Sequence, residues 1–499
     1  MPIFPAVLPR CFRRGLITAL ALATVVCCAT VESTTAGAAE DRPLNVLLIT
    51  VDDMNWDSLG VTGCKIPQIT PNIDKLAREG MLFTHGHVTI AVCQPCREVL
   101  MTGRYPDRNG GRGFQPIRTD VPTLQESLDR ADYFQGIMAK VPHLAPQSKF
   151  CWDVVVDAGQ LGAGRDPKLF YQHAKAFFEQ AKAQGKPFFL MANSQDPHRP
   201  FPRSAQQQQK TAGKEGTPRR AGSSPGVTRV IRPEEVEVPG FLPDIPDVRE
   251  EVAQYFTAVH RCDQAVGGVL KALEETGLAD DTLVMLLSDN GMAFPFAKTN
   301  VYLASTRTPW IVRWPGVVAP GGIDREHFIS GIDFMPTVLD AAGLPQVDGM
   351  DGRSFAPVLR GEKQPQRDHV YTVFHETSGR KSFEMRSVQT ARFGYLFNPW
   401  SDGETVFKNE SQSGLTFRAM QLAAQGDPAL AARVKLFQYR VVEEFYDYQN
   451  DPCALRNLID DPQYQAEIDN LRGRMHQIMK SIDDPLLEAF EEITGQESR

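Results

Sequence analysis

The chain has 499 residues, of which 42% are hydrophobic and 23% charged, and its formal net charge is −8. These values are ordinary for a soluble globular protein, and the negative balance gives no indication of nucleic acid or an anionic membrane surface as a partner. Because the chain is too long for a single hydrophobic core, we expect one large domain and one smaller domain.

The N-terminus has the pattern of an export signal. Three arginines precede the apolar run 15–29, which is too short to span a membrane comfortably, and small residues at 36–38 suit a cleavage site. We therefore predict a signal peptide over residues 1–38 and an exported protein, periplasmic or extracellular. An uncleaved anchor is the alternative. No later segment is apolar enough to cross a membrane.

Three short apolar runs are each followed by polar side chains. The runs 45–51, 188–192 and 282–287 suit strands that are buried on both faces of a parallel sheet. Behind them come Asp52 and Asp53, then Asp196, Pro197 and His198, and finally Asp289 and Asn290. A single Asp after a strand is more often a cap or turn residue. Three such ends together predict one site, because ligands bind beyond the carboxyl ends of the strands in open α/β sheets.

The polar side chains that follow the apolar runs 45–51 and 282–287 in the sequence offer only oxygen atoms as metal ligands. Asp52, Asp53, Asp289 and Asn290 suit a hard cation such as calcium or magnesium rather than zinc or copper. Adjacent carboxylates in a dry cleft are costly without a cation. Spacing in the sequence does not choose between the two ions.

The run 93–104 (CQPCREVLMTGR) is the most informative stretch of the chain. It indicates a buried thiol, Cys93, at the start of a helix, with Pro95 in the first turn and Arg97 one turn further on. A helix N-terminus favours an anion, because its N–H groups are free and its dipole end is positive. The alternative is a redox or metal pair of Cys93 and Cys96, but no other residues complete a zinc or thioredoxin pattern.

This run resembles the signature of the type I formylglycine-dependent sulfatases, Cys-x-Pro-x-Arg followed by Leu-x-Thr-Gly-Arg. In that family a maturase oxidises the cysteine to formylglycine, and the hydrate of this aldehyde attacks sulfur. The resemblance implies that the four oxygen-bearing residues above bind one divalent cation, usually calcium, together with an oxygen of residue 93. The family usually has Ser where Cys96 stands, and this departure leaves the Cys, Pro and Arg in place.

Further segments look most like the heparan N-sulfatase (sulfamidase) branch. They are 196–199, 238–248, 289–302, and His375-Glu376 followed by Met385-Arg386-Ser387. This branch implies a sulfated saccharide as partner, with N-sulfoglucosamine of heparin or heparan sulfate as the expected substrate. The alternatives are an O-sulfatase acting on another glycan or an aryl sulfate, and a non-catalytic sugar-binding pseudosulfatase. Phosphatases and phosphodiesterases of related fold bind two metals, and the ligands of a second metal are not evident here.

The resemblance also implies roles for the basic residues. Segment 136–143 resembles the Gly-Lys segment of the family, with Ala139 where glycine is usual and His143 three residues after Lys140. Lys140 and Lys298 would stabilise charge on the sulfuryl oxygens. His198 or Lys298 would protonate the leaving group. The hydroxyl of the hydrate that attacks sulfur would lie near Arg97, and His143 would take the proton from the second hydroxyl. Lone Lys and His residues are more often solvated or structural, but their positions in matched motifs favour these roles.

The expected fold is α/β. Two amphipathic helices, 169–184 and 248–276, alternate with the strands. The family resemblance implies an alkaline-phosphatase-like, doubly wound mixed or parallel sheet over 42–360.

The C-terminal part, 361–499, is predicted to be a smaller α+β subdomain. The stretches 369–374 and 392–397 alternate like antiparallel strands, and 468–482 has the pattern of a terminal helix. His375, Glu376 and Arg386 are expected to contact the sugar. A homodimer is left open.

Overall fold

The computed structural model describes residues 43–212 and 225–496. The predicted signal peptide lies outside the described residues and stays a prediction. Among the helices that are described, none is long and apolar enough to cross a membrane.

A mixed sheet forms the middle layer of the larger part. Its strands are β1 (Asn45–Asp52), β2 (Met81–Phe83), β4 (Phe134–Met138), β5 (Val154–Val156), β6 (Phe188–Pro197), β7 (Thr282–Ser288), β8 (Trp310–Arg313) and β9 (Gly322–Asp324). Their order in the sheet is β5-β4-β6-β1-β7-β8-β2-β9. The strands from β5 to β7 are parallel, and β8 runs antiparallel to its neighbours β7 and β2. The three predicted apolar runs are β1, β6 and β7, and every residue of β1 and β7 is buried.

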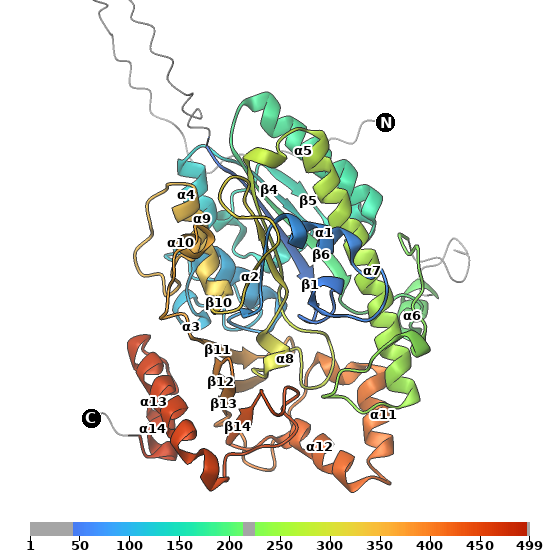
Figure 1. The fold of residues 1–499 in the computed structure, drawn as a ribbon, viewed down its shortest axis with the longest axis vertical. Coiled ribbons are helices and arrows are strands. Elements are labelled where there is room, and N and C mark those ends of the chain that lie inside the picture. The colour runs from blue at the N-terminus through green and yellow to red at the C-terminus, as the bar shows by residue number, and fades with distance from the viewer. Residues whose placement is uncertain (1–42, 213–224, 497–499) are drawn as a thin grey trace, which may run out of the picture.

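Helices cover both faces of this sheet, as a doubly wound fold requires. On one face lie α1 (Pro71–Glu79), α5 (Pro167–Gln184) and α7 (Pro246–Glu275), and on the other α2 (Cys93–Thr102), α4 (Leu124–Arg130) and α9 (Phe334–Ala341) (Figure 1). Two of them, α5 and α7, are the predicted amphipathic helices. The shorter elements are β3 (Gly86–His87), α3 (Pro106–Asn109), α6 (Ala205–Ala212), α8 (Leu303–Thr306), β10 (Ile329–Ser330) and α10 (Ala356–Leu359).

The C-terminal part is built on an antiparallel sheet. Its strands are β11 (His369–Glu376), β12 (Ser382–Thr390), β13 (Phe393–Phe397) and β14 (Glu443–Asp447), in that order. Its helices are α11 (Leu415–Ala423), α12 (Pro428–Tyr439), α13 (Gln465–Ser481) and α14 (Leu487–Thr494). The small antiparallel sheet matches the prediction, whereas β12 was not predicted. The predicted terminal helix is α13, and a further helix, α14, follows it. The boundary near residue 360 stays a prediction.

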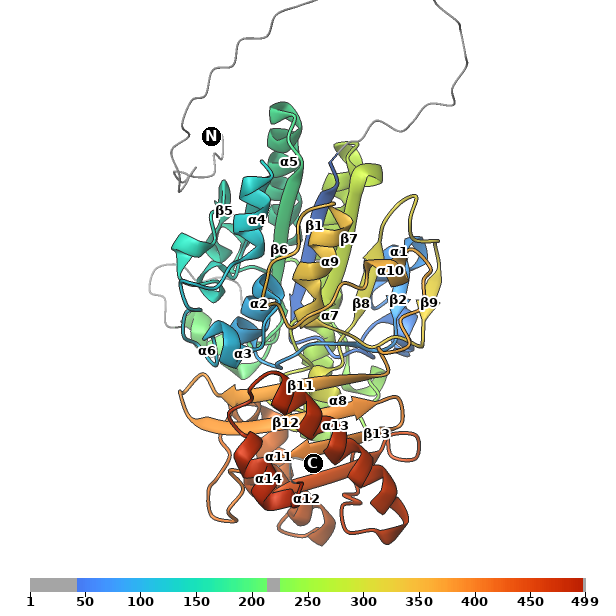
Figure 2. The same ribbon diagram turned by 90° about the vertical axis from the view of Figure 1, so that its left-hand side faces the viewer.

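The two parts meet at the edge of the large sheet where its parallel strands end. Figure 2 shows β11 and β12 directly beyond the ends of β1 and β6, with α13 and α14 in front of them. The backbone N–H of Val373 in β11 donates to the carbonyl of Thr89, just before α2, at 2.8 Å. The C-terminal part therefore covers the edge at which the predicted site residues lie.

Candidate active site

Three carboxylates and one amide meet at the carboxyl edge of the large sheet. Asp52 ends β1 and Asp53 follows it, while Asp289 and Asn290 follow the neighbouring strand β7. The Asp53 N–H donates to Asp289 Oδ1 at 3.0 Å, and the Asn290 amide donates to Asp53 Oδ1 at 2.7 Å. All four side chains are completely buried. The structure thus brings the four predicted oxygen ligands together.

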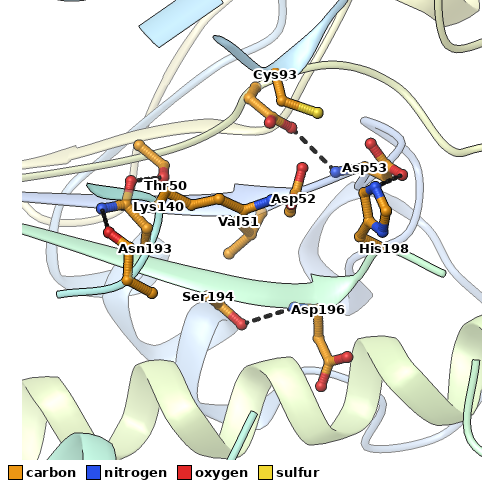
Figure 3. A network of polar contacts seen from close by, with 12 residues as sticks. Thr50, Val51, Asp52, Asp53, Cys93, Lys140, Asn193, Ser194, Asp196 and His198 are labelled. Carbon is orange, nitrogen blue, oxygen red and sulfur yellow. Dashed lines mark hydrogen bonds and ion pairs between the residues drawn. The ribbon is translucent and has the colours of Figure 1, made fainter. Parts of the chain in front are cut away.

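Cys93 opens α2, and every residue of this helix is buried. Burial raises the pKa of the Cys93 thiol well above its ordinary value, so the side chain is a neutral thiol. Its Sγ, an Asp52 oxygen and a His198 nitrogen all lie within 4.8 Å of one another. Figure 3 shows Cys93 facing the aspartates across the site. Cys96 is also a free, buried thiol.

Arg97 ties the start of α2 to the sheet. Its guanidinium is completely buried, donates to the carbonyl of Cys93 at 3.2 Å, and pairs with Asp289 Oδ2 at 2.5 Å. Its Nε also donates to Asn193 Oδ1 in β6 at 3.3 Å. Arg97 therefore contacts the backbone of residue 93 and fixes the position of the helix start.

Lys140 follows β4 in a strained stretch of backbone. Ala139 and Lys140 have φ of 56° and 52°, in the left-handed region that favours glycine. This explains why glycine is usual at position 139 in the family that the sequence resembles. The Lys140 ammonium forms a buried ion pair with Asp52, so the left-handed turn directs this cation into the site (Figure 3).

His143 lies one turn further on, in a short 3-10 helix. Its ring makes an edge contact with Phe114, at 6.2 Å between ring centroids. Burial, followed by the charges of Arg97 and Lys140, lowers the pKa of His143 to about 2. Within the described residues its Nδ1 is buried without a hydrogen-bond partner. The imidazole is therefore neutral near pH 7, with one ring nitrogen that has no hydrogen-bond partner among the described residues.

Lys298 and His198 both lie beside Asp53. Lys298 Nζ lies 2.8 and 3.0 Å from the two carboxylate oxygens of Asp53. Burial alone would lower the pKa of Lys298, but Asp53 holds it well above the ordinary value, so the ammonium stays charged. His198 follows β6, and its Nε2 lies 4.0 Å from Asp53 Oδ2 (Figure 3).

Glu410 is a residue of this site that no sequence motif indicated. It begins a 3-10 helix, Glu410–Ser413, in the C-terminal part. Its Oε2 lies 2.9 Å from Lys298 Nζ and its Oε1 lies 3.2 Å from His198 Nε2. Burial acts to raise the pKa of Glu410, but Lys298 and His198 together bring it down to about 2, so the side chain is a carboxylate. Its presence depends on how the C-terminal part packs, which the sequence does not reveal.

Two of the three predicted sugar-binding residues have partners inside the protein. Arg386 in β12 is completely buried, and its Nε and NH2 donate to the two carboxylate oxygens of Asp484 at 2.7 and 2.9 Å. His375 is also buried, and its Nδ1 lies 3.4 Å from the Arg112 guanidinium, while its Nε2 lies 3.3 Å from Asp107 Oδ2 without forming a hydrogen bond. These contacts indicate that Arg386 and His375 stabilise the folded protein. Their contact with a sugar stays a prediction.

Glu376, the third predicted sugar contact, is connected to the start of α2 by two glutamines. Gln115 donates to Glu376 Oε2 at 2.7 Å, and Gln94 in the first turn of α2 donates to the carbonyl of Gln115 at 3.0 Å. Glu376 is partly exposed. The structure therefore places it near the helix start, and its role toward a sugar stays a prediction.

The four oxygen-bearing residues fit a hard divalent cation. In the described part of the chain, Asp52 Oδ1 and Asn290 Oδ1 are buried without a hydrogen-bond partner. Oxygens of Asp52, Asp53 and Asp289 lie within 4.8 Å of one another. Burial and the neighbouring Asp52 raise the pKa of Asp289 to about 8, and a cation would remove this cost of gathering like charges. An oxygen-only donor set suits calcium or magnesium.

Comparison of the sequence with family models decides what kind of site this is. A model described as Sulfatase matches residues 44–344, more than half of the chain. The chain belongs to the sulfatase family. This sulfatase is thus a hydrolase of sulfuric esters or sulfamates, as the signature predicted. A second model, described as N-sulphoglucosamine sulphohydrolase, C-terminal, matches residues 292–404.

Known proteins resemble the sulfatase along most of its length. The human N-sulphoglucosamine sulphohydrolase is 29% identical, over 90% of this chain and 92% of the human protein. An ulvan-active sulfatase of Formosa agariphila is 26% identical, over 91% of this chain and 83% of its own.

Solved structures confirm the predicted fold class. BT4656, solved in complex with its substrate D-glucosamine-2-N,6-O-disulfate, superposes with a TM-score of 0.64 at 19% identity, covering 89% of this chain and 99% of its own. The phosphonate monoester hydrolase of Agrobacterium radiobacter gives 0.61 at 19% identity, covering 88% and 96%. Because one fold serves both enzymes, the reaction is decided by the family match and not by the fold.

Proposed function

We propose that this sulfatase removes the N-sulfate of glucosamine in heparin or heparan sulfate fragments. The observation that carries the substrate is the match to the N-sulphoglucosamine sulphohydrolase C-terminal model over residues 292–404. This segment contains Lys298 and the strands β11 and β12, which border the site. The human N-sulphoglucosamine sulphohydrolase, similar over 90% of the chain, supports the same choice. Export by the predicted signal peptide is part of the proposal.

We propose that a maturase converts Cys93 to formylglycine, and that the described thiol stands where the hydrated aldehyde would be. Support comes from the intact Cys-x-Pro-x-Arg motif and from the raised pKa of the thiol, which makes Cys93 a poor nucleophile as it stands. Mass spectrometry of the peptide containing residue 93 should show the loss of sulfur and two hydrogens and the gain of one oxygen. A fully active preparation that contains thiol alone at residue 93 would exclude this chemistry.

Asp52, Asp53, Asp289 and Asn290 would hold one divalent cation, for which we propose Ca²⁺. When bound, the cation would supply positive charge that stabilises the sulfuryl oxygens of the substrate. The ammonium groups of Lys140 and Lys298, paired with Asp52 and Asp53, flank the same space and add to this stabilisation.

Two histidines would carry the protons. His143 is neutral near pH 7 and would accept a proton from a hydroxyl at residue 93. His198 would donate a proton to the leaving nitrogen, because an amine cannot leave readily without one. One of its ring nitrogens lies within 4.8 Å of an Asp52 oxygen and of Cys93 Sγ, as this role requires.

Replacing His198 tests the proposed substrate. His198→Ala should lower kcat/KM about 10²- to 10⁴-fold on N-sulfoglucosamine, the usual contribution of a general acid. The loss should be much smaller on an activated aryl sulfate, whose leaving group needs little protonation. His369→Ala is the matched control, since His369, the first residue of β11, pairs with its neighbour Asp368 and lies outside the proposed site. Equal losses on both substrates would argue against proton donation by His198, and hydrolysis of O-sulfates without any N-sulfate would exclude the proposed substrate.

A further inference from the structure

Glu410 lies beside both Lys298 and His198, which the proposed function uses for charge stabilisation and proton donation. It pairs with Lys298 Nζ at 2.9 Å and with His198 Nε2 at 3.2 Å. The Glu410 side chain is 28% exposed and that of His198 is 20% exposed, although Lys298 between them is buried. The Glu410 carboxylate therefore contacts both catalytic groups, and its side chain is partly open to solvent.

The backbone around Glu410 is held in place by its neighbours. The Asn409 amide donates to Thr299 Oγ1 at 2.6 Å, and the Ser411 hydroxyl donates to the carbonyl of Lys298 at 3.5 Å. Consecutive residues of this segment thus contact the loop that carries Lys298. Because of these contacts, Glu410 is a built part of the site and not a mobile surface side chain.

The chemistry next to Glu410 differs between the two kinds of sulfate. In a sulfamate, the sulfur–nitrogen bond breaks, its electron pair goes to nitrogen, and sulfur gains a bond to oxygen. The nitrogen, which already bears one hydrogen, takes one proton from His198 and a second from water, and so becomes an ammonium. An O-sulfate ester takes one proton and leaves as a neutral alcohol. A carboxylate at this position therefore stabilises the sulfamate nitrogen, which bears positive charge from the moment it is protonated for cleavage, and gives no such stabilisation to the neutral alcohol of an ester.

We propose that Glu410 determines the preference for N-linked over O-linked sulfate, because its carboxylate receives the ammonium that forms on the sugar nitrogen. The inference rests on the proposed function for the direction of the preference. The effect of ligand charge can also be measured without turnover: an amino sugar should bind more tightly than its neutral counterpart, and Glu410 should be the cause.

The test compares D-glucosamine with D-glucose as inhibitors of aryl sulfate hydrolysis, at about pH 6, where the amine is protonated. Glu410→Gln keeps the size of the side chain and its hydrogen-bonding oxygen but removes the charge. We expect the inhibition constant of glucosamine to rise about 10- to 100-fold, the range for a hydrogen bond to a charged group. The inhibition constant of glucose should stay the same. The matched control is Glu404→Gln, at an exposed glutamate of the same segment, and it should change neither constant.

The same variants are then assayed for kcat/KM on N-sulfoglucosamine and on the aryl sulfate. Glu410→Gln should lower both values, since Lys298 and His198 lose a partner, and the ratio of sulfamate to aryl sulfate activity should fall by a further factor of about 10 or more. Glu410→Asp retains the charge and should retain the selectivity for glucosamine. Glu410→Asp can also be used in both assays if the Glu410→Gln variant does not fold.

Equal binding of glucosamine and glucose by the wild type would overturn the inference, as would selectivity for glucosamine that survives in Glu410→Gln. These outcomes are distinct from failure of the proposed function. An enzyme that does not release N-sulfate, but whose binding of glucosamine depends on the charge of Glu410, would refute the substrate and leave the role of Glu410 intact.

Discussion

Asp289 serves both the buried pair with Arg97 and the proposed cation, and replacing it separates the two roles. Breaking a buried ion pair by removing one partner costs about 3–5 kcal/mol. In cation-free protein, however, burial and Asp52 raise the pKa of Asp289 to about 8. The carboxyl is then largely protonated at pH 7, and the amide of Asp289→Asn resembles it closely. We therefore expect the variant to lose only about 1 kcal/mol in chelator, the value of one altered hydrogen bond.

Added Ca²⁺ should change this comparison. At 100 times its dissociation constant, a ligand that binds only the folded state adds about 2.7 kcal/mol of stability. The wild type should gain this amount, while Asp289→Asn, with one ligand charge fewer, should gain much less. The assay is urea unfolding followed by tryptophan fluorescence at pH 7, with chelator and with Ca²⁺. A loss of 3–5 kcal/mol in chelator would show that Asp289 is ionised without the cation. An equal difference under both conditions would exclude Asp289 as a ligand.

Three further predictions concern single side chains. Arg386→Met leaves Asp484 buried without its partner and should reduce the free energy of unfolding by about 3–5 kcal/mol; unchanged stability with a raised KM for sugar substrates would instead support the predicted sugar contact. The pKa of His143 is lowered from 6.5 to about 2 by burial, so below pH 6.5 the unfolded chain binds a proton that the folded chain does not. The stabilisation that His143 gives relative to His143→Gln should therefore be level above pH 6.5 and decline by about 1.4 kcal/mol per pH unit below it, and a difference in unfolding free energy that does not vary with pH would contradict this. Cys96→Ser should cost less than about 2 kcal/mol and leave the conversion of Cys93 unchanged by peptide mass spectrometry, because Cys96 is a buried, unpaired thiol; loss of conversion would give Cys96 a part in maturation.

The sequence was sufficient to predict those helices and strands that a short stretch of hydrophobic residues defines by itself. The strands β1 and β7 are continuous apolar runs because both of their faces are covered, and their last residues must then lie at one edge. The start of α2 at Cys93 could likewise be predicted, since Pro95 suits the first turn of a helix. Composition and local periodicity decide such features.

Features that depend on contacts between distant segments could not be predicted. Arg386, Ser387 and Gln389 are all fully buried in β12, and these polar residues hide the alternation that marks a strand. Arg386 is buried because Asp484, far along the chain, neutralises it. Glu410 reaches Lys298 only through the packing of the C-terminal part against the loop behind β7. No local sequence pattern indicates the ion pair of Arg386 with Asp484 or that of Glu410 with Lys298.

The most direct test of the proposed function is the analysis of both products from a saccharide with N-sulfoglucosamine at its non-reducing end. The purified enzyme, with residue 93 converted and Ca²⁺ present, should release inorganic sulfate and free amino groups in equal amounts, and Cys93→Ala should release neither. Sulfate release without new amino groups would show cleavage of an O-sulfate. An enzyme that hydrolyses aryl sulfates but leaves this saccharide intact would contradict the proposed substrate.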